Sequence, residues 1–74
     1  MTIDVELFGQ LLPGVPRRQT LAVDGVTTVA DVAGQLGLTP REVGLILIDG
    51  VQSEMEDPVP PCCRLCFFPL LSGG

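Results

Sequence analysis

The chain has 74 residues, of which 46% are hydrophobic, and nine acidic side chains against four basic ones give a formal net charge of −5. This length fits one small domain. The basic residues are four scattered arginines, whereas nucleic-acid binding usually requires a basic face, so we expect no nucleic-acid partner. No apolar run approaches the roughly 18 residues of a membrane-spanning helix, and acidic residues interrupt the first apolar stretch, which is atypical of a signal peptide. We therefore expect a cytoplasmic protein with no membrane partner.

The side chains that most enzymes use for acid–base and covalent chemistry are scarce. The sequence contains no His, Lys, Tyr or Trp. Without His it lacks the side chain that most readily exchanges protons near neutral pH, and without Lys it cannot form a Schiff base. We therefore expect a carrier or a non-catalytic subunit rather than an enzyme.

The first part of the chain predicts two strands. Residues 2–8 begin with alternating polar and apolar side chains, which is the period of a half-buried strand. Residues 19–23 predict a second strand, and the loop of residues 9–16 between them contains Gly and Pro breaks. We expect the two strands to pair antiparallel. The side chains expected to face the core from the first strand are Ile3, Val5 and Leu7.

A helix is predicted to follow Thr28. Thr28 and Asp31 have the spacing of a capping box, and Gly37 suits the left-handed residue that ends a helix. Residues 39–42 predict one further short helical turn, because Pro is favoured at the first helical position. The apolar stripe at helical spacing, which is expected to face the sheet, comprises Val29, Val32, Ala33 and Leu36.

Three more strands are predicted in the second half of the chain. Residues 45–48 are a continuous apolar run, which suits a central strand covered on both faces. Asp49-Gly50 is a strong hairpin-turn signal, so residues 51–52 begin the return strand. Residues 62–68 predict the last strand, and Pro69 ends its ability to donate ladder hydrogen bonds.

This order of elements predicts an α+β domain over residues 1–69, with one main helix packed on one face of a mixed sheet of four or five strands. Residues 70–74 are expected to form a flexible tail that ends Gly73-Gly74. Extended, the tail reaches roughly 17 Å, and residues without a Cβ atom can pass a narrow channel. A terminal carboxylate is ionised at neutral pH and is a poor electrophile, so a partner must activate it, most simply as an acyl-adenylate.

The order of elements, Leu7-Phe8-Gly9 after the first strand, and the ending from Phe67 to Gly74 resemble the sulfur-carrier proteins of molybdopterin and thiamine biosynthesis. The resemblance spans the whole chain and is nearest to the small subunit of molybdopterin synthase. It implies the ubiquitin-like β-grasp fold, with no bound cofactor and no metal. The family's Asp-Gly-Asp-like turn before the last strand is replaced here by residues 57–61, so the final sulfur acceptor stays open.

In the resembled family, three partners act on the C-terminus. A ubiquitin-activating-type enzyme uses ATP to adenylate the terminal glycine, a sulfur donor protein supplies sulfur, and a large synthase subunit uses the resulting thiocarboxylate. Carried over, the resemblance implies adenylation and sulfur attachment at Gly74 and channel contacts at Ser72 and Gly73. The residues expected to bind partners are Phe8, Phe68, Pro69, Leu70 and Leu71.

Other functions also fit this sequence. The same fold could carry sulfur in the thiamine pathway or in another sulfur route. A ubiquitin-like protein modifier would instead form an isopeptide bond between Gly74 and a lysine of a target. A plain interaction module would bind its partner without using the Gly-Gly end.

The three cysteines, Cys62, Cys63 and Cys66, invite a metal or redox interpretation, since residues 63–66 read C-x-x-C. On a strand, however, residues 63 and 66 point to opposite faces, and a zinc site usually needs four ligands. We interpret the three as reduced, buried, small hydrophobic residues. Persulfide handling by one of them is the alternative.

Three further features have competing interpretations. The acidic residues of the loop over 53–61 are either a docking patch for a basic partner or a solvated loop, and we favour the loop. Phe8 is expected on the outer face, exposed to a partner or covered by Leu11-Leu12. Arg64 is expected to pair either with a partner or with Glu6 across the sheet. The acidic residues of the loop over 53–61 are Glu54, Glu56 and Asp57.

Overall fold

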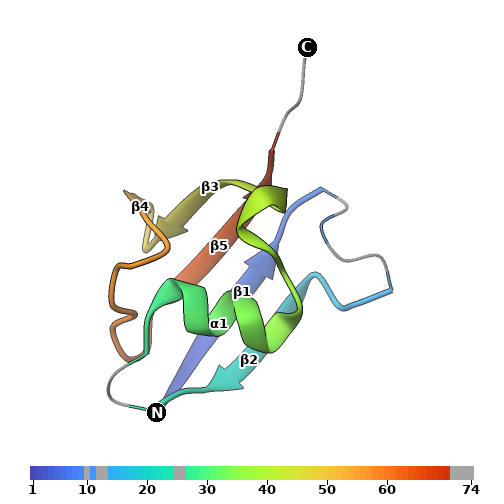
Figure 1. Ribbon diagram of the computed structural model, residues 1–74. Helices are drawn as coiled ribbons and strands as arrows, with labels where there is room; N and C mark the ends of the chain where they lie inside the picture. The colour runs from blue at the N-terminus through green and yellow to red at the C-terminus, as the bar shows by residue number, and fades with distance from the viewer. Residues whose placement is uncertain (10, 12–13, 25–26, 71–74) are drawn as a thin grey trace.

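The computed structural model describes residues 1–9, 11, 14–24 and 27–70. Within them, five strands and two short helices follow one another along the chain (Figure 1). In chain order the elements are β1 (Thr2–Leu7), β2 (Arg18–Ala22), α1 (Val29–Leu36), the 3₁₀ helix η1 (Pro40–Glu42), β3 (Val43–Ile48), β4 (Val51–Ser53) and β5 (Arg64–Pro69). No helix in these ranges is long and apolar enough to cross a membrane.

The strands form a single mixed sheet in the order β2-β1-β5-β3-β4. The pairing of β1 with β5 is parallel and the others are antiparallel, so the predicted antiparallel pairing of the first two strands is confirmed. The prediction that residues 45–48 form a central strand covered on both faces was wrong. The central strand is β5, and in β3 Ile46 alone is fully buried, because the helix covers one face of the sheet only (Figure 1).

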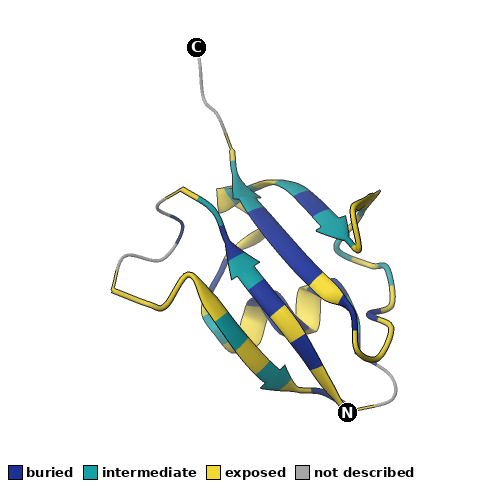
Figure 2. Ribbon diagram, turned by 180° about the vertical axis from the view of Figure 1, so that it is seen from behind, coloured by how far each residue is buried: buried dark blue, intermediate teal, exposed yellow. Residues whose placement is uncertain are grey.

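The hydrophobic core lies between α1 and one face of the sheet. Alternate residues of β1 are buried, as Figure 2 shows by its alternating bands, and the predicted inward positions Ile3, Val5 and Leu7 are confirmed. Leu65 and Phe67 of β5 are completely buried beside them. The other side chains of β1 and β5, which alternate with these buried ones, therefore point to the opposite face of the sheet. No helix covers that face in the described residues, and we call it the open face.

The local signals around α1 are confirmed. The Thr28 hydroxyl accepts a hydrogen bond from the Asp31 amide at 3.3 Å, and the Asp31 carboxylate accepts one from the Thr28 amide at 3.0 Å. Gly37 ends the helix with a φ of 88°. Pro40–Glu42 form the predicted short turn. In the apolar stripe Leu36 is half-buried, and the fully buried members are Val29, Val32 and Ala33.

Four strands have bounds that differ from the predictions. The first strand, predicted over 2–8, spans Thr2–Leu7, and the third, predicted over 45–48, spans Val43–Ile48. The second strand, predicted over 19–23, spans Arg18–Ala22. The last strand, predicted over 62–68, spans Arg64–Pro69. It begins late because Cys62 has a left-handed backbone, with a φ of 59°, which cannot continue a strand.

Five strands with β1 and β5 parallel, and one main helix on one face, constitute the ubiquitin-like β-grasp fold. The fold that the sequence predicts is therefore the fold observed. Its consequence for function is that the last strand runs through the middle of the sheet. The chain thus leaves the sheet beside both β1 and β3 (Figure 1).

Candidate functional site

Several of the predicted partner-binding residues meet where the chain leaves β5. Phe68 and Pro69 are the last two residues of that strand, and Leu70 follows them with 59% of its surface exposed. Phe8 lies beside Phe68, just beyond the end of β1. The other predicted site residues, Leu71, Ser72, Gly73 and Gly74, lie outside the described residues.

The two aromatic rings on the open face stack on each other. The parallel register pairs Leu7 with Phe67, which brings Phe8 next to Phe68, and the Phe8 amide donates to the Phe67 carbonyl at 3.0 Å. The ring centroids of Phe8 and Phe68 are 4.3 Å apart and the ring planes differ by 5°. Leu11 lies in the core cluster. The predicted outer position of Phe8 is thus correct, and its cover comes from Phe68; Leu12 lies outside the described residues.

Apolar side chains of β3 and β5 extend this aromatic pair. Leu45 lies opposite Phe68, and Leu47 lies opposite Cys66, so their side chains share the open face. Leu45 and Leu47 are half-buried, and neither belongs to the core cluster or packs against it. We call this surface the open-face patch; it comprises Phe8, Leu45, Leu47, Cys66 and Phe68.

Sequence reasoning missed Leu45 and Leu47 as parts of the open-face patch. The apolar run of β3 was interpreted as a strand with two covered faces. The signal that could have identified them is the presence of one main helix, which can cover one face of a five-stranded sheet but not both. The side chains at 45 and 47, which alternate with buried Ile46, must then lie on the uncovered face.

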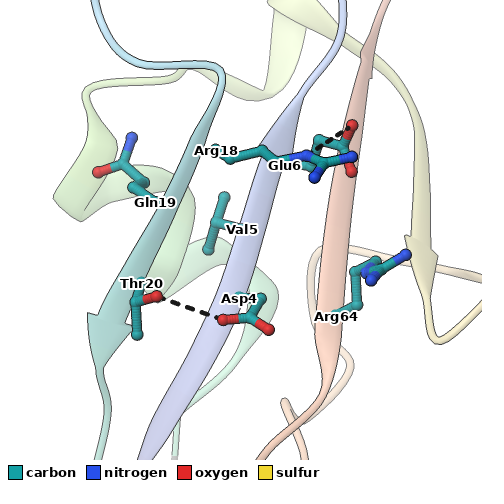
Figure 3. A pocket seen from close by; sticks show the side chains of 7 residues that line it. All are labelled: Asp4, Val5, Glu6, Arg18, Gln19, Thr20 and Arg64. Carbon is teal, nitrogen blue, oxygen red and sulfur yellow. Dashed lines mark hydrogen bonds and ion pairs between the residues drawn. The ribbon is translucent and has the colours of Figure 1, made fainter.

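The other end of the open face is polar (Figure 3). The Thr20 hydroxyl donates to the Asp4 carboxylate at 3.3 Å, and Arg18 Nε lies 3.6 Å from Glu6 Oε2. Glu6 therefore pairs with Arg18, and the prediction that it could pair with Arg64 was wrong because β2 supplies the nearer cation. Arg64 lies in register with Asp4, and its side chain points away from β1 in Figure 3. Its pairing with a partner stays a prediction.

The cysteines occupy three different environments. Cys63 is buried in the core and Cys66 is buried on the open face, which confirms that their side chains point to opposite faces of the sheet. Burial raises the pKa of both thiols. Cys62 is exposed, so the prediction that all three are buried was wrong for this residue. Among the residues that the structure describes, no group of three or more Cys, Asp or Glu side chains could hold a metal ion.

The acidic loop is tied to the start of the helix. The Met55 carbonyl accepts from the Ala30 amide at 2.8 Å and the Asp57 carbonyl accepts from the Val29 amide at 3.0 Å, so the loop satisfies free donors of the first helical turn. The Asp57 carboxylate in turn accepts from the Glu54 amide at 2.8 Å. These hydrogen bonds give the loop a structural role, and the choice of a solvated loop over a docking patch stays a prediction.

The chain is similar over its whole length to a protein of known structure. No family model matches it, and no curated protein matches it in sequence. One crystal structure of SAMP1 from Haloferax volcanii is 26% identical, with a TM-score of 0.77 over 100% of both chains. A crystal structure of H. volcanii small archaeal modifier protein 1 is 20% identical, with a TM-score of 0.73 over 95% of this chain and 98% of that one. These likenesses agree with the ubiquitin-like β-grasp fold.

Proposed function

We propose that this chain is a sulfur carrier whose C-terminal glycine, Gly74, is adenylated and converted to a thiocarboxylate that donates sulfur in cofactor biosynthesis. The observation that carries the proposal is the open-face patch, which extends to the point where the chain leaves β5 toward Gly73-Gly74. A partner that binds this patch has the tail within reach. The scarcity of catalytic side chains agrees with a carrier that depends on partner enzymes.

The first reaction is activation by a ubiquitin-activating-type enzyme with ATP. The carboxylate oxygen of Gly74 attacks the α-phosphorus of ATP and forms an acyl-phosphate bond. The bond from that phosphorus to the bridging oxygen breaks, and pyrophosphate leaves. The product is an acyl-adenylate, in which the carbonyl carbon has a good leaving group.

Sulfur transfer follows from a sulfur donor protein. The terminal sulfur of a persulfide on that protein attacks the acyl carbon, the bond from this carbon to the AMP oxygen breaks, and AMP leaves. A second thiol then reduces the sulfur–sulfur bond. This step releases the thiocarboxylate on Gly74 and leaves the two thiol sulfurs joined as a disulfide.

In the complex with a partner enzyme, the open-face patch provides the binding surface and Gly74 at the end of the tail is the residue that reacts. Half-buried apolar side chains lose their remaining contact with water when a partner covers them, and aromatic residues contribute strongly to such interfaces. Phe8, Phe68 and exposed Leu70 are the proposed anchors. The polar end of the open face, with Arg64 and Asp4, is the proposed rim of the interface.

The proposed pathway is molybdopterin synthesis. The support is the sequence resemblance to the small subunit of molybdopterin synthase, from Leu7-Phe8 to the Gly-Gly ending. In this proposal a large synthase subunit binds the same patch and receives the tail in its active site. The synthase that co-purifies with the chain identifies the sulfur acceptor. Co-purification with a thiamine-pathway enzyme would contradict the molybdopterin proposal and indicate the thiamine pathway instead.

A second candidate function is conjugation to other proteins. It is favoured by the 26% identity, over the whole chain, to SAMP1, since small archaeal modifier protein 1 is by its name a modifier. The acyl-adenylate of Gly74 would then react, directly or through a thioester, with the amine of a target lysine. Because this chain has no Lys, it would be attached singly rather than as lysine-linked polymers.

Intact-mass spectrometry of the chain isolated from its native cells tests both functions. A form in which one oxygen is exchanged for one sulfur, mapped to Gly74 by fragmentation, is the result expected for the carrier. Covalent conjugates joined to lysines would favour the modifier. In a reconstituted reaction with the activating enzyme, ATP and a sulfur donor, deletion of Gly74 is the control. Sulfur transfer by that deletion variant would refute the carrier function, and conjugation of that variant to target proteins would refute the modifier function.

A further inference from the structure

The exit of the chain from the sheet is closely surrounded by backbone. Between β3 and β5, Val43 pairs with Pro69 but Leu45 pairs with Phe68, so Gly44 is the extra residue of a β-bulge. A Cβ atom at Gly44 would lie 2.8 Å from the Leu70 Cα and 2.9 Å from the Pro69 carbonyl oxygen. Both distances are too short for non-bonded atoms, and both neighbours are backbone. A side chain at this position would therefore have to move the departing chain.

A second glycine approaches the exit from the other side. A Cβ atom at Gly9 would lie 2.7 Å from the Pro69 Cγ, and the φ of Gly9 is +65°, which favours glycine. The end of β1 and the start of β3 thus border the end of β5 at the same edge (Figure 1). The Leu70 amide donates to the Glu42 carbonyl at 3.0 Å, so the chain is still held one residue beyond β5.

The other described glycines do not share this feature. A Cβ atom at Gly14, Gly34, Gly37 or Gly50 would meet nothing within 4 Å. Among the glycines that the structure describes, Gly9 and Gly44 are therefore the two at which a Cβ atom would meet neighbouring atoms, and these atoms belong to Pro69 and Leu70. A positive φ, the usual reason for a glycine in a turn, does not account for the glycine at position 44, because Gly44 has no positive φ.

We propose that Gly9 and Gly44 form a clasp that fixes the direction in which the chain leaves the sheet, and that they act as positioning residues for delivery of Gly74 to the adenylating enzyme. The inference rests on the proposed carrier or modifier function. Its physical reason is preorganisation. The enzyme must receive the tail from the direction set at Leu70, and a misplacement of about 1 Å in a reacting group can slow a reaction by about 100-fold.

Two glycine-to-alanine pairs test the clasp. Gly44→Ala is matched by Gly34→Ala, since neither position has a positive φ and Gly34 has open space. Gly9→Ala is matched by Gly50→Ala, because both have a positive φ but only Gly9 has a close neighbour. The second pair keeps the inference testable if one clasp variant fails to fold.

The first measurement is amide hydrogen exchange, which needs no partner enzyme. In both clasp variants the Leu70 amide should exchange about tenfold faster or more relative to the Val59 amide, which is bonded to Thr27 elsewhere in the fold. The ratio separates local opening from a general loss of stability. An unchanged ratio in Gly44→Ala and Gly9→Ala would overturn the clasp. So would an equal rise in the Gly34→Ala and Gly50→Ala controls.

The second measurement is ATP–pyrophosphate exchange by the ubiquitin-activating-type enzyme, with each variant as substrate. Gly44→Ala leaves the side chains of the open-face patch unaltered but moves the Leu70 anchor, so kcat should fall by about tenfold or more, while KM should rise no more than it does in Leu70→Ala. A kcat equal to that of Gly34→Ala would overturn the positioning role. If the unaltered chain supports no exchange, the proposed function fails, and the hydrogen-exchange ratio still decides whether the clasp exists.

Discussion

Phe67 and Phe68 are adjacent and chemically identical, but substitutions at the two positions should have different effects. Substitution of Phe67 should mainly lower the stability of the fold, and substitution of Phe68 should mainly weaken binding to the activating enzyme. Phe67 is completely buried in the core, whereas Phe68 is half-buried on the open face. Truncation of a buried Phe to Ala costs about 3–5 kcal/mol. At about 0.05–0.15 kcal/mol per residue, a chain of this length has a free energy of unfolding of about 4–11 kcal/mol. Phe67→Ala therefore removes a large share of the stability.

The cost of Phe68→Ala should be about half as large. Full burial of a Phe side chain contributes about 1.5–3 kcal/mol, and a half-buried ring has about half of that to lose. Loss of the stack on Phe8, with rings 4.3 Å apart, adds about 0.5–1.5 kcal/mol. We therefore expect about 2 kcal/mol for Phe68→Ala. A double-mutant cycle with Phe8→Ala should give a coupling energy of about 0.5–1.5 kcal/mol.

Binding to the activating enzyme should show the reverse order. Phe68→Ala removes an anchor of the open-face patch, and loss of a hot-spot residue weakens binding by at least about 2 kcal/mol, or about 30-fold in Kd. Phe67→Leu, which keeps most of the core volume and costs less than about 1.5 kcal/mol of stability, is the control and should bind within about twofold of the unaltered chain.

Urea unfolding followed by far-ultraviolet circular dichroism measures the stability, since the chain has no Trp or Tyr to report by fluorescence. Isothermal titration calorimetry measures the Kd for the activating enzyme. The reasoning would be refuted if Phe68→Ala destabilised the fold as much as Phe67→Ala, or if the cycle gave no coupling. Equal binding by Phe68→Ala and Phe67→Leu would remove the open-face patch from the interface.

At about pH 8, iodoacetamide should modify exposed Cys62 at least about 100-fold faster than buried Cys63 and Cys66; peptide mapping measures this, and equal rates would contradict the burial. Burial raises the pKa of Cys63 and Cys66 above the ordinary 9.0, so the unfolded chain releases these protons first. Stability should therefore fall as pH rises past about 9, and urea titrations should show a shallower fall in Cys66→Ala; an equally steep fall would be the contrary result. Thr28→Ala should cost about 1 kcal/mol, whereas Thr28→Ser should restore the cap; an equal loss in both would argue against the capping box.

The elements of this fold were predictable because their signals are local. The capping box of Thr28 and Asp31 spans one helical turn, and Asp49-Gly50 adopts the positive φ angles of a hairpin turn within two residues. The alternation of polar and apolar side chains over residues 2–7 is likewise a pattern of residues that are adjacent in the sequence. For the candidate site, the outer position of Phe8 followed from that same alternation. The roles of Ser72, Gly73 and Gly74 came from the resemblance and stay predictions.

Tertiary structure decided what depends on residues far apart in the chain. Insertion of β5 between β1 and β3 made the apolar run of β3 a half-exposed surface, and it brought Leu45 and Leu47 beside the Phe8–Phe68 stack. It also set Gly44 against Leu70. The sequence by itself determined which segments are helix, strand and turn, since short-range sterics and hydrogen bonds set these. Strand order, and hence the surface offered to a partner, depends on long-range pairing that no local pattern encodes.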